Sequence, residues 1–304
     1  MSRGFKGVSP LFDYELTLDY LNNLPKIHDK FFNFTPYKIC HSKRKIISCS
    51  IFKRSTEGVY GVSPYNDEFE TKYLNKFFNL MKYIKKHFPT FGVMLFTTDD
   101  LAHLFKNENI NIYTNPYNEG LIHTFSRFLA IDYDIDLMMV IDVDETHLRH
   151  HKLFDDRSSR FLIVGKYDYF VNPEKTAKKY SAIMAGGFQL CKKDITFKMQ
   201  DIIPRFLYHQ THNLHLEPKT IYNAKSNEEH YLGFGNRPFT YGCDERFLTK
   251  FLYFYLTRKG VLTTYTNNPK NEENIMDFCF LKQVRGHPVN PLDQNWNPIK
   301  IIIA

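Results

Sequence analysis

The sequence has little of what marks a secreted, zinc-stapled or membrane-spanning protein. Its 304 residues contain five cysteines, an odd number, and no Cys-x-x-Cys pair, so we expect unpaired thiols and no zinc or disulfide framework. No hydrophobic leader follows Met1, and no apolar run is long enough to cross a bilayer. These absences predict a soluble, cytoplasmic protein without a transmembrane segment.

Familiar nucleotide-binding signatures are missing as well. The chain contains no Gly-x-x-x-x-Gly-Lys-Ser/Thr loop and no complete Gly-x-Gly-x-x-Gly string, which excludes a recognisable P-loop or dinucleotide fingerprint. Its net charge is +7, from 40 basic and 33 acidic residues, and this charge suits an anionic substrate, nucleic acid or a membrane surface. The basic residues are scattered rather than gathered in a tail, so the charge by itself selects none of these partners.

What the chain does contain is an alternation of predicted strands and helices that begins near residue 46. Apolar runs bounded by turn signals predict strands, and apolar residues at helical spacing predict helices. The expected strands cover residues 46–52, 92–96, 110–113, 137–141, 161–164 and 181–190, and the expected helices cover 73–88, 99–106, 120–133, 194–209 (interrupted near Pro204) and 246–256. This alternation predicts an α/β fold with three α/β/α layers around a mostly parallel central sheet. We expect residues 1–44 to form an N-terminal extension packed on the core, and residues 45–304 to form the main domain.

The stretch Leu137-Met-Met-Val-Ile141, followed at once by Asp142-Val-Asp144, carries the strongest functional signal. Five consecutive apolar residues predict a strand that is buried on both faces. Ligands of parallel α/β sheets bind outside the carboxyl ends of the strands, which is where the two carboxylates stand. Residues two apart in extended backbone point the same way, so both carboxylates can face one divalent cation. Such a cation could neutralise a diphosphate leaving group, and the pattern predicts a metal-dependent enzyme that acts on a phosphate-bearing substrate.

A second acidic string, Asp132-Tyr-Asp134-Ile-Asp136, precedes the same apolar run. It lies where a helix is expected to give way to a strand, so we interpret it as a solvated acidic connection. Short strings of this kind occur by chance, and their position in the fold decides their meaning.

Three further clusters are predicted to fall at the same end of the sheet as the aspartate pair. Arg127 lies on the helix that enters the strand, and its planar guanidinium can pair with the aspartates or with a diphosphate. Two glycines within one strand, Gly186 and Gly187, indicate either a bulge or the close approach of a ligand or of other backbone. Asp244 and Glu245 stand near a predicted helix start, where a carboxylate can cap the helix or bind and deprotonate an acceptor hydroxyl.

In their order and spacing these motifs resemble those of GT-A glycosyltransferases, over residues 46 to about 256. The resemblance implies a hexosyltransferase-type enzyme that moves a sugar from a nucleoside diphosphate sugar, with a UDP-sugar as the expected donor. The acceptor would be a hydroxyl of a glycan, a protein or a modified nucleic acid. The resemblance also implies a Mn²⁺ or Mg²⁺ cofactor that chelates the donor diphosphate, with Asp142 near the ribose and the metal and Asp144 as a metal ligand.

The same resemblance assigns the other site residues. The expected donor-binding residues are Ile51, Phe52, Arg127, Asp142, Val143, Asp144, Gly186 and Gly187. Asp244 or Glu245 would bind the acceptor or act as the base of an inverting enzyme, whereas Gln189 or the donor phosphate would take that part in a retaining one. His287 could supply a third metal ligand, as a C-terminal histidine does in glycogenin-like members, but the residues around it depart from their motif. The stereochemical outcome therefore stays open.

Two other functions fit parts of the sequence. Val140-Ile-Asp142-Val-Asp144-Glu-Thr146 also matches the Asp-x-Asp-x-Thr signature of haloacid-dehalogenase-like phosphatases, with Asp142 as nucleophile, Asp144 as acid/base and Mg²⁺ as cofactor. That signature normally lies on the first strand of its fold, whereas about 90 residues of predicted α/β sequence precede it here. A non-catalytic nucleic-acid-binding protein would fit the charge of +7 and the aromatic content of 16%, although no recognisable binding motif supports it.

Overall fold

The computed structural model describes residues 16–53, 69, 73–117, 120–143, 159–163, 185–212, 243–267, 278–282 and 301–303. They form an α/β fold with a mixed, mostly parallel sheet, as the alternation of strands and helices predicts. The chain divides into two compact units. The β2–β5 unit consists of Lys26–Arg157 and Gln189–Pro204, and the β8 unit consists of Met1–Pro25, Ser158–Phe188 and Arg205–Ala304.

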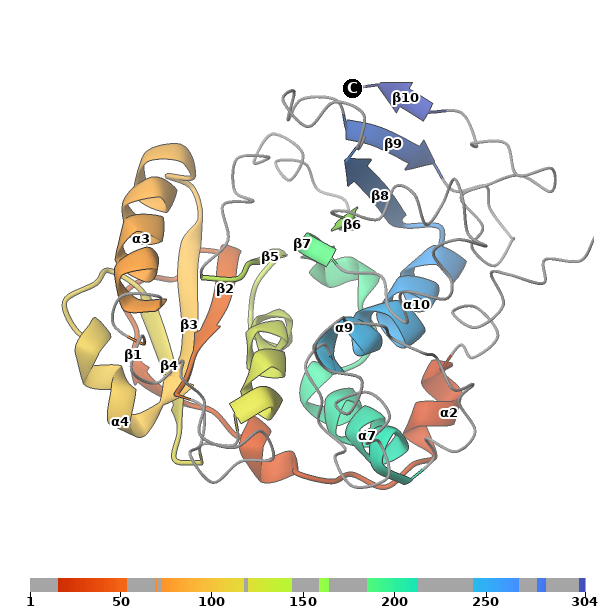
Figure 1. Cartoon of the computed structure of the whole chain (residues 1–304), viewed down its shortest axis with the longest axis horizontal. Helices are drawn as coiled ribbons and strands as arrows, with labels where there is room; N and C mark the ends of the chain where they lie inside the picture. Colours follow the sequence, from red (N-terminus) through yellow and green to blue (C-terminus); the bar gives the residue numbers. More distant parts are fainter. Residues whose placement is uncertain are drawn as a thin grey trace, which may run out of the picture. The chain divides into compact units, whose positions relative to one another are not determined.

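Parallel strands form the centre of the β2–β5 unit. The strands are β2 (Lys45–Ile51), β3 (Gly92–Thr98), β4 (Asn111–Asn115) and β5 (Leu137–Val140), and β1 (Thr35–Lys38) pairs antiparallel with β4. They lie side by side in the order β1-β4-β3-β2-β5 (Figure 1). The register places Ile51 opposite Thr97, and Ser48 opposite Val140. The carboxyl ends of the four parallel strands therefore point to one edge of the sheet.

Burial explains why these segments are strands. Every residue of β3, β4 and β5 is buried, and β2 is buried at all but two positions. Burial along the whole strand is typical of parallel strands that are covered on both faces. The strands predicted at 46–52, 92–96, 110–113 and 137–141 are confirmed, with their ends shifted by one or two residues.

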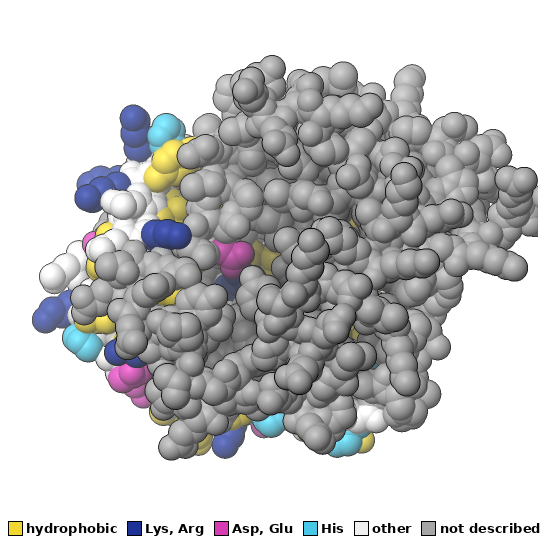
Figure 2. Space-filling view, viewed as in Figure 1, with side chains coloured by type: hydrophobic (Ala, Val, Ile, Leu, Met, Phe, Trp, Pro, Cys, Tyr) yellow, Lys and Arg dark blue, Asp and Glu magenta, His cyan; other side chains and the backbone are white. Residues whose placement is uncertain are grey.

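The helices of this unit follow the predicted apolar spacing. Helix α3 (Asn75–His87) buries Phe77, Leu80, Met81 and Ile84. Its lysines at 76, 82, 85 and 86 are exposed, and Figure 2 shows several Lys and Arg side chains at the edge of the molecule where α3 lies in Figure 1. The other helical segments are η1 (Asp29–Phe32), α4 (Asp99–Ala102), η3 (His103–Phe105), η4 (Gly120–Asp132) and η6 (Lys192–Asp194). Segment η4 is of the 3₁₀ type and contacts β2, β3 and β5.

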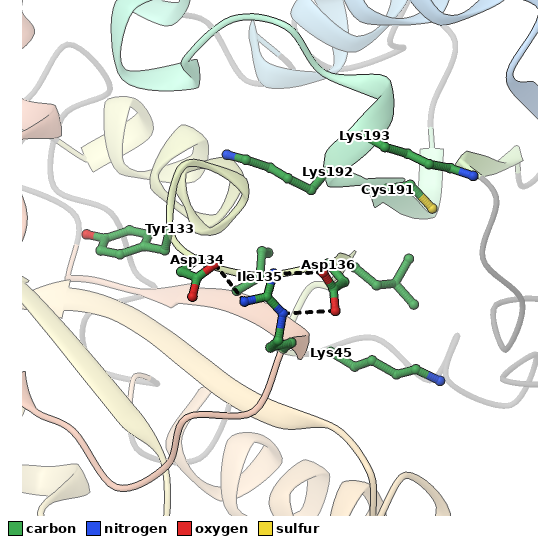
Figure 3. A pocket seen from close by; sticks show the side chains of 10 residues that line it. Lys45, Tyr133, Asp134, Ile135, Asp136, Cys191, Lys192 and Lys193 are labelled. Atoms are coloured by element: carbon green, nitrogen blue, oxygen red, sulfur yellow. Dashed lines mark hydrogen bonds and ion pairs between the residues drawn. The ribbon is translucent and has the colours of Figure 1, made fainter.

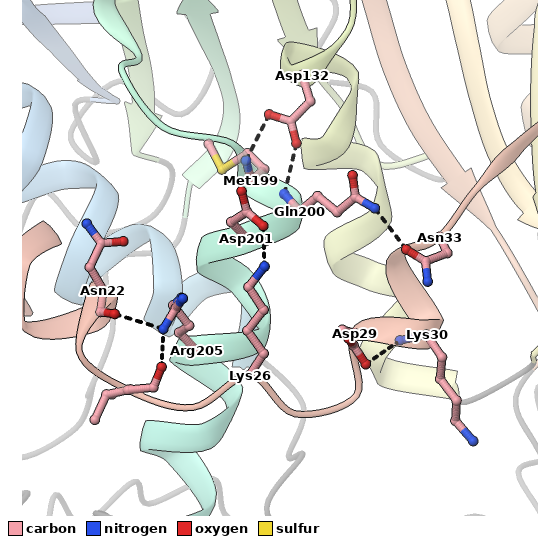
Figure 4. A network of polar contacts seen from close by, with 11 residues as sticks. Asn22, Lys26, Asp29, Lys30, Asn33, Asp132, Met199, Gln200, Asp201 and Arg205 are labelled. Atoms are coloured by element: carbon pink, nitrogen blue, oxygen red, sulfur yellow. Dashed lines mark hydrogen bonds and ion pairs between the residues drawn. The ribbon is translucent and has the colours of Figure 1, made fainter.

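One predicted helix is wrong at both its start and its interior. The helix expected over 194–209 with a break near Pro204 is instead α7 (Met199–His212), which continues through Pro204. The late start has a tertiary cause, because the Asp132 carboxylate accepts hydrogen bonds of 2.8 Å from the backbone N–H groups of Met199 and Gln200 (Figure 4). A carboxylate at this position satisfies N–H groups that a helix start leaves without partners.

The β8 unit contains both strands and helices. Parallel β6 (Ser159–Ile163) and β8 (Leu262–Asn267) are followed by β9 (Phe278–Lys282) and β10 (Ile301–Ile303), which pair antiparallel in that order. The helices are α2 (Leu18–Asn22), α9 (Cys243–Phe247), the π-type η9 (Leu248–Leu252) and α10 (Tyr253–Arg258). The predicted helix at 246–256 is confirmed, but it begins three residues earlier, at Cys243.

Strand β7 (Ala185–Cys191) is shared between the units, which meet in the sequence after Phe188. It confirms the carboxyl half of the strand predicted at 181–190. The other boundaries follow Pro25, Arg157 and Pro204, and the first of these falls inside the expected extension 1–44. Among the helices that the structure describes, none is both long and apolar enough to cross a membrane.

Candidate functional site

Asp142 lies just beyond the carboxyl end of β5, as the sequence predicts. The backbone N–H of Ile141 donates to the carbonyl of Ser48 over 3.1 Å, so the chain stays beside β2 for one residue past the end of the strand. Ile141 is buried, whereas the side chain of Asp142 is 43% exposed. The strand thus delivers a carboxylate from the core to the surface at the sheet edge where ligands of α/β proteins bind.

Arg127 is the ion-pair partner of Asp142. The Nη1 atom of Arg127, on η4, contacts Oδ1 of Asp142. The arginine side chain is 13% exposed and its guanidinium carbon lies 5.5 Å from the centroid of the Phe128 ring. Its backbone is fixed to the sheet, because Ser48 Oγ donates to the Arg127 carbonyl over 2.6 Å. The pairing of Arg127 with an aspartate, which the sequence allows, is therefore present in the structure.

Cys49 lies on β2, next to Ser48 in the sequence, and is fully buried. Burial raises the pKa of the Cys49 thiol to about 12, and the positive charge of Arg127 partly opposes the rise. A thiol with this pKa is protonated at neutral pH and is a poor nucleophile. Among the described residues of the site, Arg127 and Asp142 carry the charge, and Cys49 belongs to the core.

Apolar and aromatic side chains border the same edge. Ile51, the last residue of β2, is 2% exposed, and Phe52 follows it. The Phe52 ring lies 5.6 Å from the ring of His123, a residue of η4 that is 2% exposed. Burial lowers the pKa of His123 to about 4, so its imidazole is neutral at pH 7, with Nε2 donating to the Tyr117 carbonyl over 2.6 Å. His123 therefore acts here as a polar member of an aromatic cluster and carries no charge.

Polar residues at the ends of β3 and β4 were missed by the sequence reasoning. Thr97 Oγ1 donates to the Ile51 carbonyl over 2.7 Å, and Asn115 makes hydrogen bonds that hold nearby loop backbone. Thr98 is 1% exposed, and its Oγ1 has no hydrogen-bond partner among the described residues. These residues lie at the carboxyl ends of their strands, the edge to which Asp142 also belongs, so the strand-end rule could have identified them.

The remaining predicted residues fall into three groups. Val143 is buried beside Asp142, and Gln189 is fully buried on the part of β7 that belongs to the β2–β5 unit. In the β8 unit, the first turn of α9 contains Asp244, which is 8% exposed, together with the backbone of Glu245. The two glycines predicted near the donor, Gly186 and Gly187, lie on the part of β7 that belongs to the β8 unit. The structure thus brings five predicted residues to one edge of the β2–β5 unit: Ile51, Phe52, Arg127, Asp142 and Val143.

The predicted metal ligands are only partly within the described residues. Asp142 supplies one partly exposed carboxylate, and carboxylate oxygens are the ligands that Mg²⁺ and Mn²⁺ favour. Asp144 and His287, the other predicted ligands, lie outside the described residues. Within the described ranges, no group of three or more His, Cys, Asp or Glu residues is arranged to hold a metal ion.

Comparison with known proteins adds no relative to this picture: no protein-family model matches the chain, and no curated protein matches it. The sequence motifs and the geometry at the carboxyl ends of β2 and β5 are therefore the features that bear on function.

Proposed function

We propose that this protein is a metal-dependent glycosyltransferase with a three-layer, GT-A-like arrangement, which transfers a sugar from a nucleoside diphosphate sugar to an acceptor hydroxyl. The observation that carries the proposal is the position of Asp142. It is a partly exposed carboxylate at the carboxyl end of a buried parallel strand, and it is oriented by the ion pair with Arg127. In open α/β sheets this edge is where nucleotides and their phosphates bind.

The residues around Asp142 suit the parts of such a donor. A carboxylate is a suitable ligand for Mn²⁺ or Mg²⁺, and the predicted second ligand, Asp144, is two residues further along the chain. When bound, the cation would neutralise charge on the diphosphate. Arg127 could turn from Asp142 toward a phosphate, because its planar fork pairs equally well with either anion. Phe52, beside the end of β2, offers an aromatic surface for the base.

The acceptor side of the reaction rests on fewer observations. Asp244 and Glu245 share the first turn of α9, where a carboxylate could bind an acceptor hydroxyl and take its proton. In a retaining enzyme Gln189 or the donor phosphate would have this part. The proposal includes both outcomes, and product analysis of the anomeric configuration decides between them.

The phosphatase alternative predicts different products from the same aspartates. In that family the nucleophilic aspartate normally follows the first strand of the fold, whereas here β2, β3 and β4 precede β5 in the sequence and run parallel in the same sheet. This order favours the transferase. Two parallel incubations of the full chain test the choice, one with Mn²⁺ and a panel of nucleotide sugars and one with Mg²⁺ and a phosphomonoester such as p-nitrophenyl phosphate: release of a nucleoside diphosphate in the first supports transfer or donor hydrolysis, and release of inorganic phosphate in the second alone supports the phosphatase.

Substitution of Asp142 tests the site itself. Asp142→Asn keeps the shape of the side chain and removes its charge, so we expect the Mn²⁺-dependent release of nucleoside diphosphate to fall by about 100-fold or more, because loss of an outer-shell partner of a metal already costs about 10–100-fold and a direct ligand should matter more. Asp19→Asn is the matched control, because Asp19 is an exposed residue of α2 in the β8 unit. Circular dichroism checks that both variants fold. Full activity of Asp142→Asn would reject the proposal.

A further inference from the structure

A cavity of about 530 Å³ lies at the opposite end of β5 from Asp142, within the β2–β5 unit. Its walls come from three segments, 44–45 at the start of β2, 133–137 at the start of β5 and 191–193 at the end of β7 (Figure 3). Asp136 precedes β5 and Asp142 follows it, and six residues of extended chain span about 20 Å. The cavity is therefore separate from the site around Asp142. Its volume is within the range of small-molecule pockets, about 300–1,000 Å³.

Backbone hydrogen bonds hold the three walls together. The N–H groups of Asp136 and Leu137 donate to the Arg44 carbonyl over 2.8 and 3.2 Å, and the N–H of Lys192 donates to the Asp136 carbonyl over 2.9 Å. The Arg44 side chain also joins two of the walls. Its Nε and Nη2 atoms donate to the two oxygens of Asp136 over 3.0 and 2.9 Å, and Nη1 donates to Asp134 over 2.7 Å (Figure 3). The cavity is thus a built feature of the unit.

These contacts of Arg44 also change the interpretation of the acidic string at 132–136. Asp134 and Asp136 are exposed, as a solvated connection requires, but both carboxylates are engaged by Arg44. These hydrogen bonds raise the pKa of the Arg44 guanidinium above its ordinary value, with Asp136 as the larger cause. The acidic side chains therefore neutralise Arg44 within the wall of the cavity.

Three lysines leave the cavity with an excess of positive charge. Its lining contains four basic side chains, Arg44, Lys45, Lys192 and Lys193, and two carboxylates, a net charge of +2. Lys192 Nζ donates to the Ile131 carbonyl, and Lys45 Nζ lies 5.7 Å from the centroid of the Phe91 ring. In the part of the chain that the structure describes, none of the three lysines forms an ion pair with a carboxylate, and the charge of Lys192 is felt at Asp132, where it lowers the pKa of that carboxyl against the rise that burial causes. An ammonium group has three donors, so Lys192 keeps donors beyond the one that it uses.

We propose that this cavity binds a small anion that carries at least two negative charges, of the phosphate-ester or pyrophosphate class. Lysine ammonium groups bind phosphate as point charges, and Tyr133, Ile135 and Leu137 line the cavity with surface for an organic part of the ligand. The inference does not depend on Asp142 or on a metal ion. It assigns the protein a second phosphate-binding site, at the amino end of β5.

Titration of the full chain with inorganic pyrophosphate, followed by calorimetry in EDTA at physiological salt, tests this proposal. EDTA removes divalent cations that could carry pyrophosphate to Asp142. We expect saturable binding to one site, weakened about tenfold or more by the Lys45→Gln/Lys193→Gln double variant, because the loss of a charge-assisted contact costs about that factor. Lys193→Gln alone, at an exposed position, should weaken binding by a smaller factor, and it guards against misfolding of the double variant.

Two control variants test whether pyrophosphate binds at this cavity and not elsewhere on the protein. Lys198 is an exposed lysine a few residues after the cavity wall, so Lys198→Gln should leave the pyrophosphate affinity within about twofold, as expected of a distant surface charge screened by salt. Asp142→Asn should leave the affinity unchanged, which separates this site from the proposed donor site. Absence of saturable binding, or an equal loss in Lys198→Gln, would overturn the proposal.

Discussion

Asp132 shows how one carboxylate can couple a helix start to pH. Its two oxygens accept the N–H groups of Met199 and Gln200. Burial nevertheless raises its pKa to about 6, and the two backbone hydrogen bonds oppose this rise only in part. The ordinary value for an aspartate in an unfolded chain is about 3.9, so the folded protein holds this proton more tightly than the unfolded chain does.

The sign of the resulting pH dependence follows from linkage. The contribution of the Asp132 proton to stability is complete below about pH 4 and is lost as the pH rises through about 6. We expect the free energy of unfolding of the wild type, relative to that of Asp132→Asn, to fall by about 2–3 kcal/mol between pH 4 and pH 7. Urea unfolding of both proteins across this range measures the difference. A constant difference would contradict the raised pKa.

Gly92, the first residue of β3, is held against a histidine ring. A Cβ atom at this position would lie 2.1 Å from Cε1 of His41, and the ring cannot swing away freely, because the Val93 N–H donates to its Nε2 over 3.1 Å. We expect Gly92→Ala to lower the free energy of unfolding by about 1–3 kcal/mol, the usual cost of overpacking. Urea unfolding measures this loss.

A double-variant test isolates that contact. In a His41→Ala background the added methyl group has room, so Gly92→Ala should then cost much less than in the wild type. Equal costs in the two backgrounds would show that the ring is not the obstacle, and that the strand itself resists the substitution.

At the scale of elements, the end of α10 is set by Gly260. Its φ of 67° is in the left-handed region, the N–H of Gly260 donates to the Thr257 carbonyl, and the N–H of Val261 donates to the Leu256 carbonyl. This is the hydrogen-bond pattern of a Schellman motif, which turns the chain out of the helix and here leads into β8.

Substitutions of Gly260 should therefore destabilise the β8 unit, and the loss should be larger for residues that tolerate the left-handed backbone region less well. Gly260→Ala should lower the free energy of unfolding by about 1 kcal/mol, because a Cβ atom disfavours this backbone region. Gly260→Asn should cost less, since asparagine tolerates it. Thermal unfolding of the three proteins gives the order, and a less stable Asn variant would argue against the backbone explanation.

Across elements, Ser48 shows how the sheet positions the candidate site. Its hydroxyl holds the backbone of η4 at Arg127, and its carbonyl holds the backbone just before Asp142. One β2 residue thereby fixes both members of the ion pair. The sequence motifs identified Arg127 and Asp142 separately. The hydrogen bond between Ser48 and Arg127 joins residues 79 positions apart, so no local sequence signal predicts it.

At the scale of the whole molecule, ligand binding should appear as a gain in stability. A ligand that binds only the folded protein stabilises it by mass action, about 2.7 kcal/mol at 100 times its dissociation constant. We expect Mn²⁺ together with UDP to raise the unfolding temperature more than UDP in EDTA does. The Mn²⁺-dependent increment should vanish in Asp142→Asn, and its survival there would place the metal elsewhere.

Features that depend on neighbouring residues could be predicted from the sequence, whereas features that depend on residues distant in the chain could not. The strands at 92–96 and 137–141 were predictable because a run of apolar residues must be buried whatever surrounds it. The helix expected at 194–209 was misplaced, because its start depends on a carboxylate 67 residues away. The interruption expected near Pro204 was also wrong, because the helix continues through that residue.

The sequence by itself determined the alternation of strands and helices, the burial of β5 and the emergence of Asp142 at its carboxyl end, because apolar periodicity and strand ends are local properties of the chain. The tertiary structure alone decided that Arg127 pairs with Asp142, that His123 is neutral, and that Arg44 engages Asp134 and Asp136 beside a lysine-lined cavity. Ion pairs, pKa shifts and cavities arise between residues that are distant in the chain, and their partners are chosen only when the strands and helices pack.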